Sequence, residues 1–176
     1  TGIEHENSQV RGVIVEGNKI DCHAVLVAMG AWSQMASSWL HSEIKMSPWK
    51  GQILRLRLPG APILCSVSAG GHFVSTKPDG LTWVGPTFED VGLNEDISQK
   101  ARTEIMNSAR KFIPSLSRGR VVMQTACIRP LSADRKLVLG AVPELDGAFI
   151  ATGGGRLGLM LGPAMAQLAA DLIADG

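Results

Sequence analysis

The residues from 153 to 158, Gly-Gly-Gly-Arg-Leu-Gly, are the segment of the sequence best suited to chemistry. They follow an apolar stretch typical of a strand, Ala148–Thr152, and precede an apolar stretch typical of a helix, Leu159–Ile173. Such a junction presents bare backbone N–H groups and the positive end of a helix dipole to whatever lies above it. We therefore expect a ligand bound there to carry negative charge or electron-rich oxygen.

Three interpretations of this glycine segment stay open on the residues alone. It matches G-x-G-x-x-G, but a dinucleotide fingerprint also needs a further strand with an acidic residue about 20 positions on, for which the printed sequence has no room. It can instead be a tight turn that lets a helix pack closely on a sheet. The third interpretation is a helix N-terminus that faces a non-phosphate acceptor, such as the pyrimidine edge of a flavin.

Arg129 is the second candidate for chemistry, and it follows an apolar, β-like run. A buried arginine needs a partner, because an unpaired buried charge costs several kcal/mol. The spacing allows an internal ion pair with Asp134. It equally allows a guanidinium fork that binds the carboxylate of a substrate, since charge-assisted bonds of this kind are strong and geometrically specific.

Metal and hydrolase chemistry find no support in the sequence. The cysteines Cys22, Cys65 and Cys127 form no CxxC pair, and no histidine stands at ligand spacing from Cys, Asp or Glu. We therefore predict no metal ligands. No G-x-S-x-G elbow surrounds any serine, so serine hydrolysis is not expected.

Composition narrows the class of protein further. The 176 residues, with a formal net charge of +1, suit one domain or one domain and part of another, and no basic stripe indicates nucleic-acid binding. No apolar run reaches the ~20 residues of a membrane span. An odd number of widely spaced cysteines argues against a disulfide framework. We therefore expect an intracellular, cytoplasmic protein, and the absence of an initial Met suggests a piece of a longer one.

The positions of the apolar residues predict which elements hold these candidates. We expect one buried strand at Ala24–Ala28 that ends in a tight turn, and an amphipathic helix over Ser98–Ile113. In the last helix we expect Leu161, Met165, Leu168 and Leu172 to lie on one face, with Pro163 tolerated only in the first turn. Further strands are predicted over residues 10–15, 19–22, 52–58, 72–76, 81–85, 120–126, 136–139 and 148–152, and a short helix over 33–40.

Five strings taken together resemble the C-terminal part of the D-amino acid oxidase family, closest in style to glycine oxidase and the D-amino acid dehydrogenases. Their order and spacing carry the resemblance, which covers nearly the whole chain. The strings are 24–33 (Ala-Val-Leu-Val-Ala-Met-Gly-Ala-Trp-Ser), 50–52 (Lys-Gly-Gln), 77–92 (Lys-Pro-Asp-Gly-Leu-Thr-Trp-Val-Gly-Pro-Thr-Phe-Glu-Asp-Val-Gly), 128–134 (Ile-Arg-Pro-Leu-Ser-Ala-Asp) and 151–158 (Ala-Thr-Gly-Gly-Gly-Arg-Leu-Gly).

The resemblance implies a mixed α/β and α+β fragment of a two-domain FAD-linked oxidoreductase. Residues 1–45 would belong to a Rossmann-like FAD-binding domain, residues 46–126 to an antiparallel-rich substrate-binding domain, and residues 127–176 would return to the FAD domain. The family's first βαβ unit, with its dinucleotide fingerprint, would precede residue 1. The partner implied for this chain is therefore the N-terminal FAD-binding segment of the same protein, with a homo-oligomer as an additional option.

Carried over residue by residue, the resemblance assigns roles to the candidates. Arg129 matches the arginine that binds the substrate α-carboxylate, and Arg156 is a second candidate. The cofactor-binding positions are Gly30, Ala31 and Trp32 beside the flavin, and Gly153, Gly154, Gly155, Arg156, Leu157 and Gly158 at its pyrimidine edge. The family often has His and Asn where this chain has Gly154 and Leu157, and the chain contains no Tyr, a second carboxylate partner in some members.

The implied function is FAD-dependent oxidation of an amino acid or secondary amine to an imine and then a 2-oxo acid, by hydride transfer to flavin N5. We expect the fragment alone to be inactive and to bind FAD weakly. Two alternatives stay open: a non-enzymatic ligand-binding or assembly domain with a structural glycine loop, and a nucleotide-binding domain that relies on the G-x-G-x-x-G match.

Overall fold

The computed structural model describes residues 2–175, which form two compact units. Unit 1 comprises the residues up to 48 together with those from 129 onwards, and unit 2 comprises residues 49–128. The boundaries predicted from the sequence fall a few residues earlier in each case. The assignment of unit 1 to the cofactor and of unit 2 to the substrate stays a prediction.

Unit 1 contains two three-stranded sheets. The first is an antiparallel meander of β1 (Gly2–Glu6), β2 (Gln9–Val15) and β3 (Asn18–Asp21). The second has the order β10-β11-β4, from β10 (Val138–Ala141), β11 (Ala148–Thr152) and β4 (Val25–Val27). In it β10 pairs antiparallel with β11, whereas β11 and β4 run parallel. The ends of β11 and β4 therefore lie at the same edge of the sheet.

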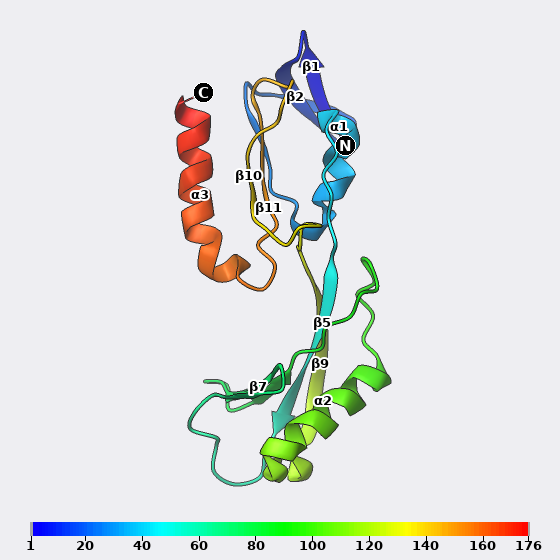
Figure 1. Cartoon of the computed structure of the whole chain (residues 1–176), viewed down its shortest axis with the longest axis vertical. Helices are drawn as coiled ribbons and strands as arrows, with labels where there is room; N and C mark the ends of the chain where they lie inside the picture. Colours follow the sequence, from blue (N-terminus) through cyan, green and yellow to red (C-terminus); the bar gives the residue numbers. More distant parts are fainter. Residues whose placement is uncertain (1, 176) are drawn as a thin grey trace. The chain divides into compact units, whose positions relative to one another are not determined.

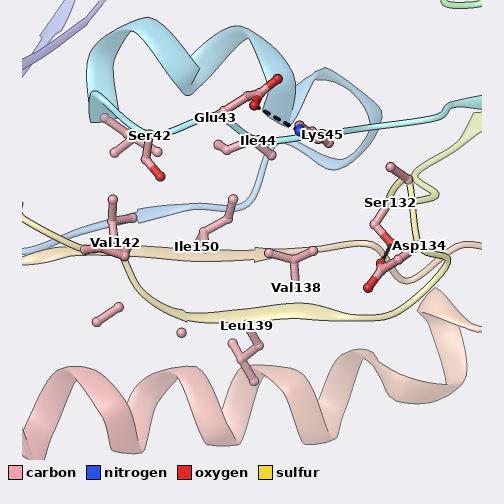
Figure 2. Close-up of a pocket in the computed structure, with 15 residues that line it drawn as sticks. Ser42, Glu43, Ile44, Lys45, Ser132, Asp134, Val138, Leu139, Val142 and Ile150 are labelled. Atoms are coloured by element: carbon pink, nitrogen blue, oxygen red, sulfur yellow. Dashed lines mark hydrogen bonds and ion pairs between the residues drawn. The ribbon is translucent and has the colours of Figure 1, made fainter.

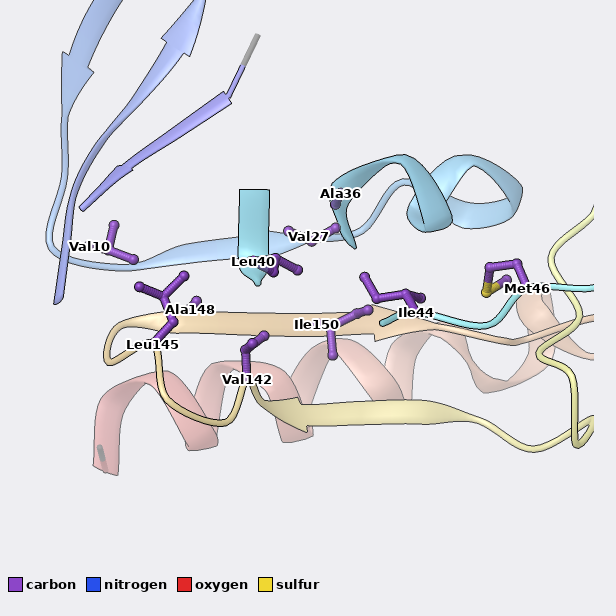
Figure 3. Packing of buried hydrophobic residues seen from close by; sticks show 10 residues of the cluster. All are labelled: Val10, Val27, Ala36, Leu40, Ile44, Met46, Val142, Leu145, Ala148 and Ile150. Carbon is purple, nitrogen blue, oxygen red and sulfur yellow. The ribbon is translucent and has the colours of Figure 1, made fainter. Parts of the chain in front are cut away.

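One apolar cluster holds unit 1 together (Figure 3). The 3-10 helix η1 (Gly30–Ala36) and helix α1 (Ser37–Leu40) cover one face of the second sheet, and helix α3 (Gly158–Asp175) packs against β10 and β11 (Figure 1). Leu40 of α1 and Ile150 of β11 are both buried in this cluster. Its full membership is Val10, Val27, Ala36, Leu40, Ile44, Met46, Val142, Leu145, Ala148 and Ile150.

Unit 2 is a five-stranded sheet with one long helix on one face. The strand order is β6-β7-β8-β5-β9, from β5 (Trp49–Arg57), β6 (Val67–Ala69), β7 (His72–Thr76), β8 (Thr82–Gly85) and β9 (Arg120–Arg129). The period of two in β5 buries Leu54 and Leu56 on the helix side and turns Arg55 to the other face. There Arg55 stands opposite Trp83 in the register, and its guanidinium lies 4.4 Å from the centroid of the indole ring.

Helix α2 (Gln99–Phe112) covers the face of this sheet on which Leu54 and Leu56 lie. Ser98 caps it, because the Ser98 hydroxyl accepts the backbone N–H of Ala101. Ile105 and Ala109 are fully buried on the same helix face, one turn apart. After Ile113 the chain continues as the 3-10 helix η2 (Pro114–Arg118), since proline cannot continue the α-helical hydrogen bonds.

Most of these elements confirm the sequence-based predictions, and the mixed class with antiparallel-rich sheets is confirmed as well. The apolar face predicted for the last helix is not the packed one: Leu168 and Leu172 are 54% and 40% exposed, whereas Ala169 is buried. Because nearly the whole circumference of α3 is apolar, periodicity could not identify the packed face. Pro163 lies in the second turn of α3, so the helix accommodates a proline beyond the first turn to which the sequence-based condition confined it.

Candidate functional site

The glycine segment connects β11 to α3 through a backbone that only glycine accommodates well. Gly153 and Gly155 have φ angles of +80° and +50°, a conformation that costs other residues free energy. A Cβ atom at position 153 would lie 2.5 Å from the carbonyl oxygen of Lys136, and one at position 154 would lie 2.8 Å from Cα of Gly158. The three glycines therefore shape a turn in which backbone, not side chain, is presented.

The turn after β4 lies beside the glycine segment. Gly30 has φ +58°, and its carbonyl oxygen accepts a hydrogen bond of 2.9 Å from the hydroxyl of Thr152. Thr152 is buried, and it is the last residue of β11. Because β4 and β11 are parallel neighbours, their carboxyl ends meet at one edge, which is the common ligand-binding edge of such sheets.

Arg129 reaches the same edge from the end of β9. The backbone N–H of Gly155 donates to the carbonyl oxygen of the next residue, Pro130, at 3.0 Å. A Cβ atom at position 30 would lie 4.0 Å from Cβ of Pro130. The structure thus brings together three segments that are distant in the sequence, residues 29–33, 129–131 and 152–158.

The side chains at these positions divide into buried and exposed ones. Ala31 is buried and contributes its backbone to the turn, whereas Trp32, Arg156 and Leu157 are exposed. Arg129 is half-buried. Arg129 and Arg156 each take part in a further interaction. The only basic groups predicted for the site, Arg129 and Arg156, therefore come from two different segments that meet at Gly155.

The carboxylate of Asp134 accepts hydrogen bonds within its own turn. The donors are the backbone N–H of Lys136 at 3.1 Å and the hydroxyl of Ser132 at 2.9 Å. These two bonds, the backbone one first, hold the pKa of the Asp134 carboxyl below its ordinary value. The bonds give Asp134 a local structural role in the turn that follows Arg129.

Sequence reasoning missed two residues beside the site. Thr152 connects the two turns, but only the parallel pairing of strands that are distant in the sequence reveals it. Ser33 follows the Gly30 turn and is fully buried, and its hydroxyl oxygen has no hydrogen-bond partner among the described residues. A buried polar atom in this state calls for a partner such as water or a ligand. The printed sequence offers no signal for either role beyond proximity to the glycines.

A cavity of about 440 Å³ lies in unit 1 outside these three segments. Figure 2 shows Val138 and Ile150 pointing towards residues 42–45, whereas Leu139 points towards helix α3. Glu43 and Lys45 form an exposed ion pair of 3.2 Å along it. None of the glycines of the candidate site lines this cavity, so we do not assign it to that site.

Within residues 2–175 no three side chains of His, Cys, Asp or Glu gather as metal ligands would. None of the helices there combines the length and the apolar composition that a bilayer crossing requires.

Comparison with known proteins gives relatives along the whole chain. It is 31% identical to glycine oxidase of Pseudomonas aeruginosa over 96% of this chain and 49% of that protein. It is 24% identical to D-amino acid dehydrogenase of Neisseria gonorrhoeae over 97% of this chain and 41% of that protein. The chain thus spans about half the length of the relatives it matches.

Solved structures agree with this result. Glycine oxidase from Bacillus cereus superposes with a TM-score of 0.90 at 27% identity, covering 99% of this chain and 49% of that one. Glycine oxidase from Geobacillus kaustophilus gives 0.91 at 25% identity, with 99% and 47% covered. The family model described as FAD dependent oxidoreductase matches residues 1–172. The resemblance drawn from the five sequence strings is confirmed, and the chain belongs to this family of FAD dependent oxidoreductases.

Proposed function

We propose that the intact protein oxidises an amino acid or a secondary amine to the imine, which hydrolyses to a 2-oxo acid. The observation that carries the proposal is the meeting of Arg129, the Gly30 turn and the glycine segment at one sheet edge, through the bond from Gly155 N–H to the Pro130 carbonyl. The family and the glycine oxidase and D-amino acid dehydrogenase relatives support it.

FAD is the cofactor that the family implies, and the residues present fit it. The glycine segment offers a cradle in which a side chain would collide with backbone, and the Ser33 hydroxyl beside it is buried without a hydrogen-bond partner among the described residues. Residues 30–32 and 153–158 would hold the flavin end. When bound, FAD accepts at N5 the hydride that leaves the substrate carbon.

Arg129 would bind and orient the substrate. A guanidinium and a carboxylate form two parallel hydrogen bonds, so the arginine fixes both the position and the direction of the substrate Cα–H bond. Arg156 is the second catalytic candidate. The exposed N–H groups at the start of α3 would stabilise negative charge at the flavin edge, because a helix N-terminus carries partial positive charge.

The departures from the family pattern bear on selectivity. Gly154 and Leu157 stand where the family often has His and Asn, so two polar contacts near the flavin are replaced by a bare backbone and an exposed apolar side chain. This chain contains no Tyr, so its own residues supply no tyrosine hydroxyl as a second carboxylate partner. We expect the guanidinium of Arg129 to contribute a correspondingly larger share of substrate binding.

The partner proposed for this chain is the N-terminal FAD-binding segment of the same protein. The chain spans about half the length of its relatives, and helix α3 leaves Leu159 and Met160 98% and 79% exposed. Apolar surface of this extent marks an interaction site. The chain without that segment is expected to bind FAD weakly and to be inactive. The three cysteines, all free, accord with a cytoplasmic location.

The exposed apolar helix also favours the second candidate function, an assembly or ligand-binding domain whose glycine loop is structural. The two functions differ in what happens to the flavin. An amino-acid substrate should bleach the flavin absorbance of the intact enzyme under anaerobic conditions. Flavin that stays oxidised with glycine, D-amino acids and secondary amines alike would favour the assembly domain.

The role of Arg129 is tested in the full-length protein by Arg129→Ala. Loss of a charge-assisted bidentate contact should raise KM for the amino acid roughly 10- to 150-fold, with the flavin absorbance retained. Arg120→Ala is the matched control, because Arg120 is exposed and begins the strand that Arg129 ends. Equal KM values for the two variants would refute the assigned role.

A further inference from the structure

Two histidine side chains from distant parts of the sequence meet on the surface of unit 1, and the function proposed above uses neither. His5 belongs to strand β1, and His41 directly follows helix α1, which packs against β1. Their Nε2 atoms lie 3.0 Å apart, and both residues are exposed. The two are 36 positions apart, so the local spacings that predicted no metal ligands carry no signal of their contact. Two facing imidazole nitrogens are a candidate site for a transition metal.

The backbone that carries each ring is held by the fold. Strand β1 pairs with β2, and the register between them shifts just before His5, an irregularity of the kind that re-aims a side chain. His41 has φ +49°, a conformation that persists only where the surrounding structure imposes it. Leu40 before it is buried in the apolar cluster, and the backbone N–H of Ile44 after it donates to the Ser37 hydroxyl at 3.0 Å. The two rings therefore project from fixed backbone positions.

Without a metal, the contact between the two rings is a hydrogen bond. One Nε2 carries a proton and donates it to the lone pair of the other, because two lone pairs or two N–H groups would repel at this distance. The rings stand almost perpendicular, at 88°, with their centroids 5.1 Å apart, so they are not stacked. When both rings carry their proton at Nδ1, both Nε2 lone pairs are available. A metal ion can then take the place of the shared proton after a small rotation of the exposed rings.

The distance between the two nitrogens indicates which metals fit. With metal–nitrogen bonds of about 2.0–2.1 Å, two nitrogens 3.0 Å apart subtend an angle of roughly 90–100° at a shared ion. This is the angle between neighbouring ligands of a square-planar or octahedral ion, and it is smaller than the tetrahedral angle of about 109° that Zn²⁺ adopts. Imidazole suits both Cu²⁺ and Ni²⁺, and Cu²⁺ stands highest in the general order of affinities. We therefore expect Cu²⁺ to bind more tightly than Ni²⁺.

Water would complete the coordination of the ion. Within residues 2–175 no third side chain of His, Cys, Asp or Glu joins the pair as a ligand. The carboxylates nearest in sequence bond elsewhere, Glu6 to Arg11 at 3.6 Å and Glu43 to Lys45 at 3.2 Å. A site with two protein ligands and open positions differs from a closed structural site of four ligands, and it should exchange its ion with the solution.

We propose that His5 and His41 form a two-ligand site for a divalent transition-metal ion, with Cu²⁺ as the best fit, and that the bound ion cross-links β1 to α1. Strand β1 stands at one end of its sheet order, with β2 as its only neighbour there among the described residues. An ion that binds only the folded arrangement stabilises it. The proposal goes beyond the oxidation proposed above and does not depend on it, because neither histidine belongs to the three segments of the candidate site.

The site is tested in the full-length protein, without a histidine tag and stripped of metal, by calorimetric titration with Cu²⁺, Ni²⁺ and Mg²⁺. One equivalent of Cu²⁺ should bind, and His5→Gln or His41→Asn should weaken it more than about 100-fold, since loss of a mere outer-shell partner already costs 10- to 100-fold. Asn is used at position 41 because it tolerates the left-handed backbone. His23→Gln, at another exposed histidine, is the matched control and should leave the affinity unchanged. Mg²⁺ prefers oxygen ligands and should not compete.

Two further measurements separate this site from adventitious binding. The electron paramagnetic resonance spectrum of bound Cu²⁺ should show coupling to two imidazole nitrogens, which His5→Gln should abolish. One equivalent of Cu²⁺ should raise Tm of the unchanged protein and of His23→Gln, reversibly with EDTA, but not Tm of His5→Gln.

Equal Cu²⁺ affinities of His5→Gln and the unchanged protein would overturn the proposal, as would the absence of saturable Cu²⁺ binding. Without added metal, an amino-acid substrate should bleach the flavin of His5→Gln as it does that of the unchanged protein. Failure of the metal site and failure of the proposed oxidation are therefore seen in separate measurements.

Discussion

Helices α2 and α3 belong to different units and place their apolar residues in opposite ways. In α2, Ile105 and Ala109 are fully buried against the sheet, and its other faces are largely polar. In α3, Ala169 is the single buried side chain among its described residues, whereas Leu159 and Met160 are almost fully exposed. Both helices pack on a sheet within their own unit, but only one of them has its apolar surface covered.

The difference distinguishes unit 2, in which the apolar face of the helix is covered, from unit 1, in which the helix leaves apolar side chains exposed. A helix that is apolar around most of its circumference is expected to be covered on more than one side. Unit 2 closes its core with an amphipathic helix and a polar cluster in which the amide of buried Gln52 bonds to Glu89, Ser98 and Gln124. Unit 1 combines an uncovered helix with a glycine segment that presents its backbone, which is the combination expected where a cofactor and another part of the protein are to be bound.

The largest effect should come from the buried helix face of unit 2. Ile105→Ala removes a fully buried side chain from its apolar cluster and should lower the free energy of unfolding by about 2–5 kcal/mol. Urea denaturation of the 176-residue chain, followed by circular dichroism, measures it. Leu159→Ala, at a 98% exposed position, should stay within about 0.5 kcal/mol of the unchanged chain.

The substitution Leu159→Ala also tests the contrast between α2 and α3 in the full-length protein. If another segment covers α3 there, Leu159→Ala should destabilise the full-length protein more than the 176-residue chain. Equal costs of the Ile105 and Leu159 substitutions in the short chain would contradict the contrast between the two helices.

The next effect concerns the glycine segment. Gly153→Ala places a methyl group 2.5 Å from the carbonyl oxygen of Lys136 at a φ of +80°, so it should cost about 1–3 kcal/mol and weaken flavin binding. Gly162→Ala is the control, because a methyl group at this helical glycine would meet no atom within 4 Å and should add up to about 1 kcal/mol of stability. Denaturation and flavin titration give both values, and the same sign of change for both variants would contradict the prediction.

Local patterns in the sequence were sufficient for most elements. The period of two in β5 and the spacing of Ala101, Ile105 and Ala109 in α2 identify a strand and a helix because each has one apolar face. The glycine segment was recognised as a junction of strand and helix for the same local reason. Its partners at the sheet edge could only be expected from the family resemblance.

Contacts between distant residues lay beyond such patterns. The bond from Thr152 to the Gly30 carbonyl depends on the parallel pairing of β4 with β11, and nothing in either segment specifies that pairing. Gln52 and Gln124 are 72 positions apart, and an isolated glutamine carries no signal of burial. The packed face of α3 could not be identified, because Leu168 and Ala169 are equally acceptable on periodicity alone.

The smallest expected effect is a pH dependence of the stability, for which Glu89 of unit 2 is compared with Asp134 of unit 1. Burial alone would raise the pKa of the Glu89 carboxyl, but bonds from Thr87 and Gln52 and the charge of Lys50 together hold it below its ordinary value of 4.5. A pKa lowered by folding means that ionised Glu89 stabilises the protein above about pH 4.5 and that this contribution is lost as the pH falls through the lower folded value. Asp134 follows the same direction, with bonds inside its own exposed turn.

Glu89→Gln should therefore destabilise the chain at pH 7 and lose this disadvantage progressively below about pH 4.5, as the wild-type carboxyl becomes protonated. Asp134→Asn should show the same trend with a smaller amplitude, because solvent screens an exposed carboxylate while Glu89 is surrounded by buried Gln52, Thr87 and Lys50. Urea denaturation at pH 7, 5 and 3 measures both. A larger amplitude for Asp134 would contradict the expectation that the carboxylate bonded to buried side chains contributes more to stability than the exposed one.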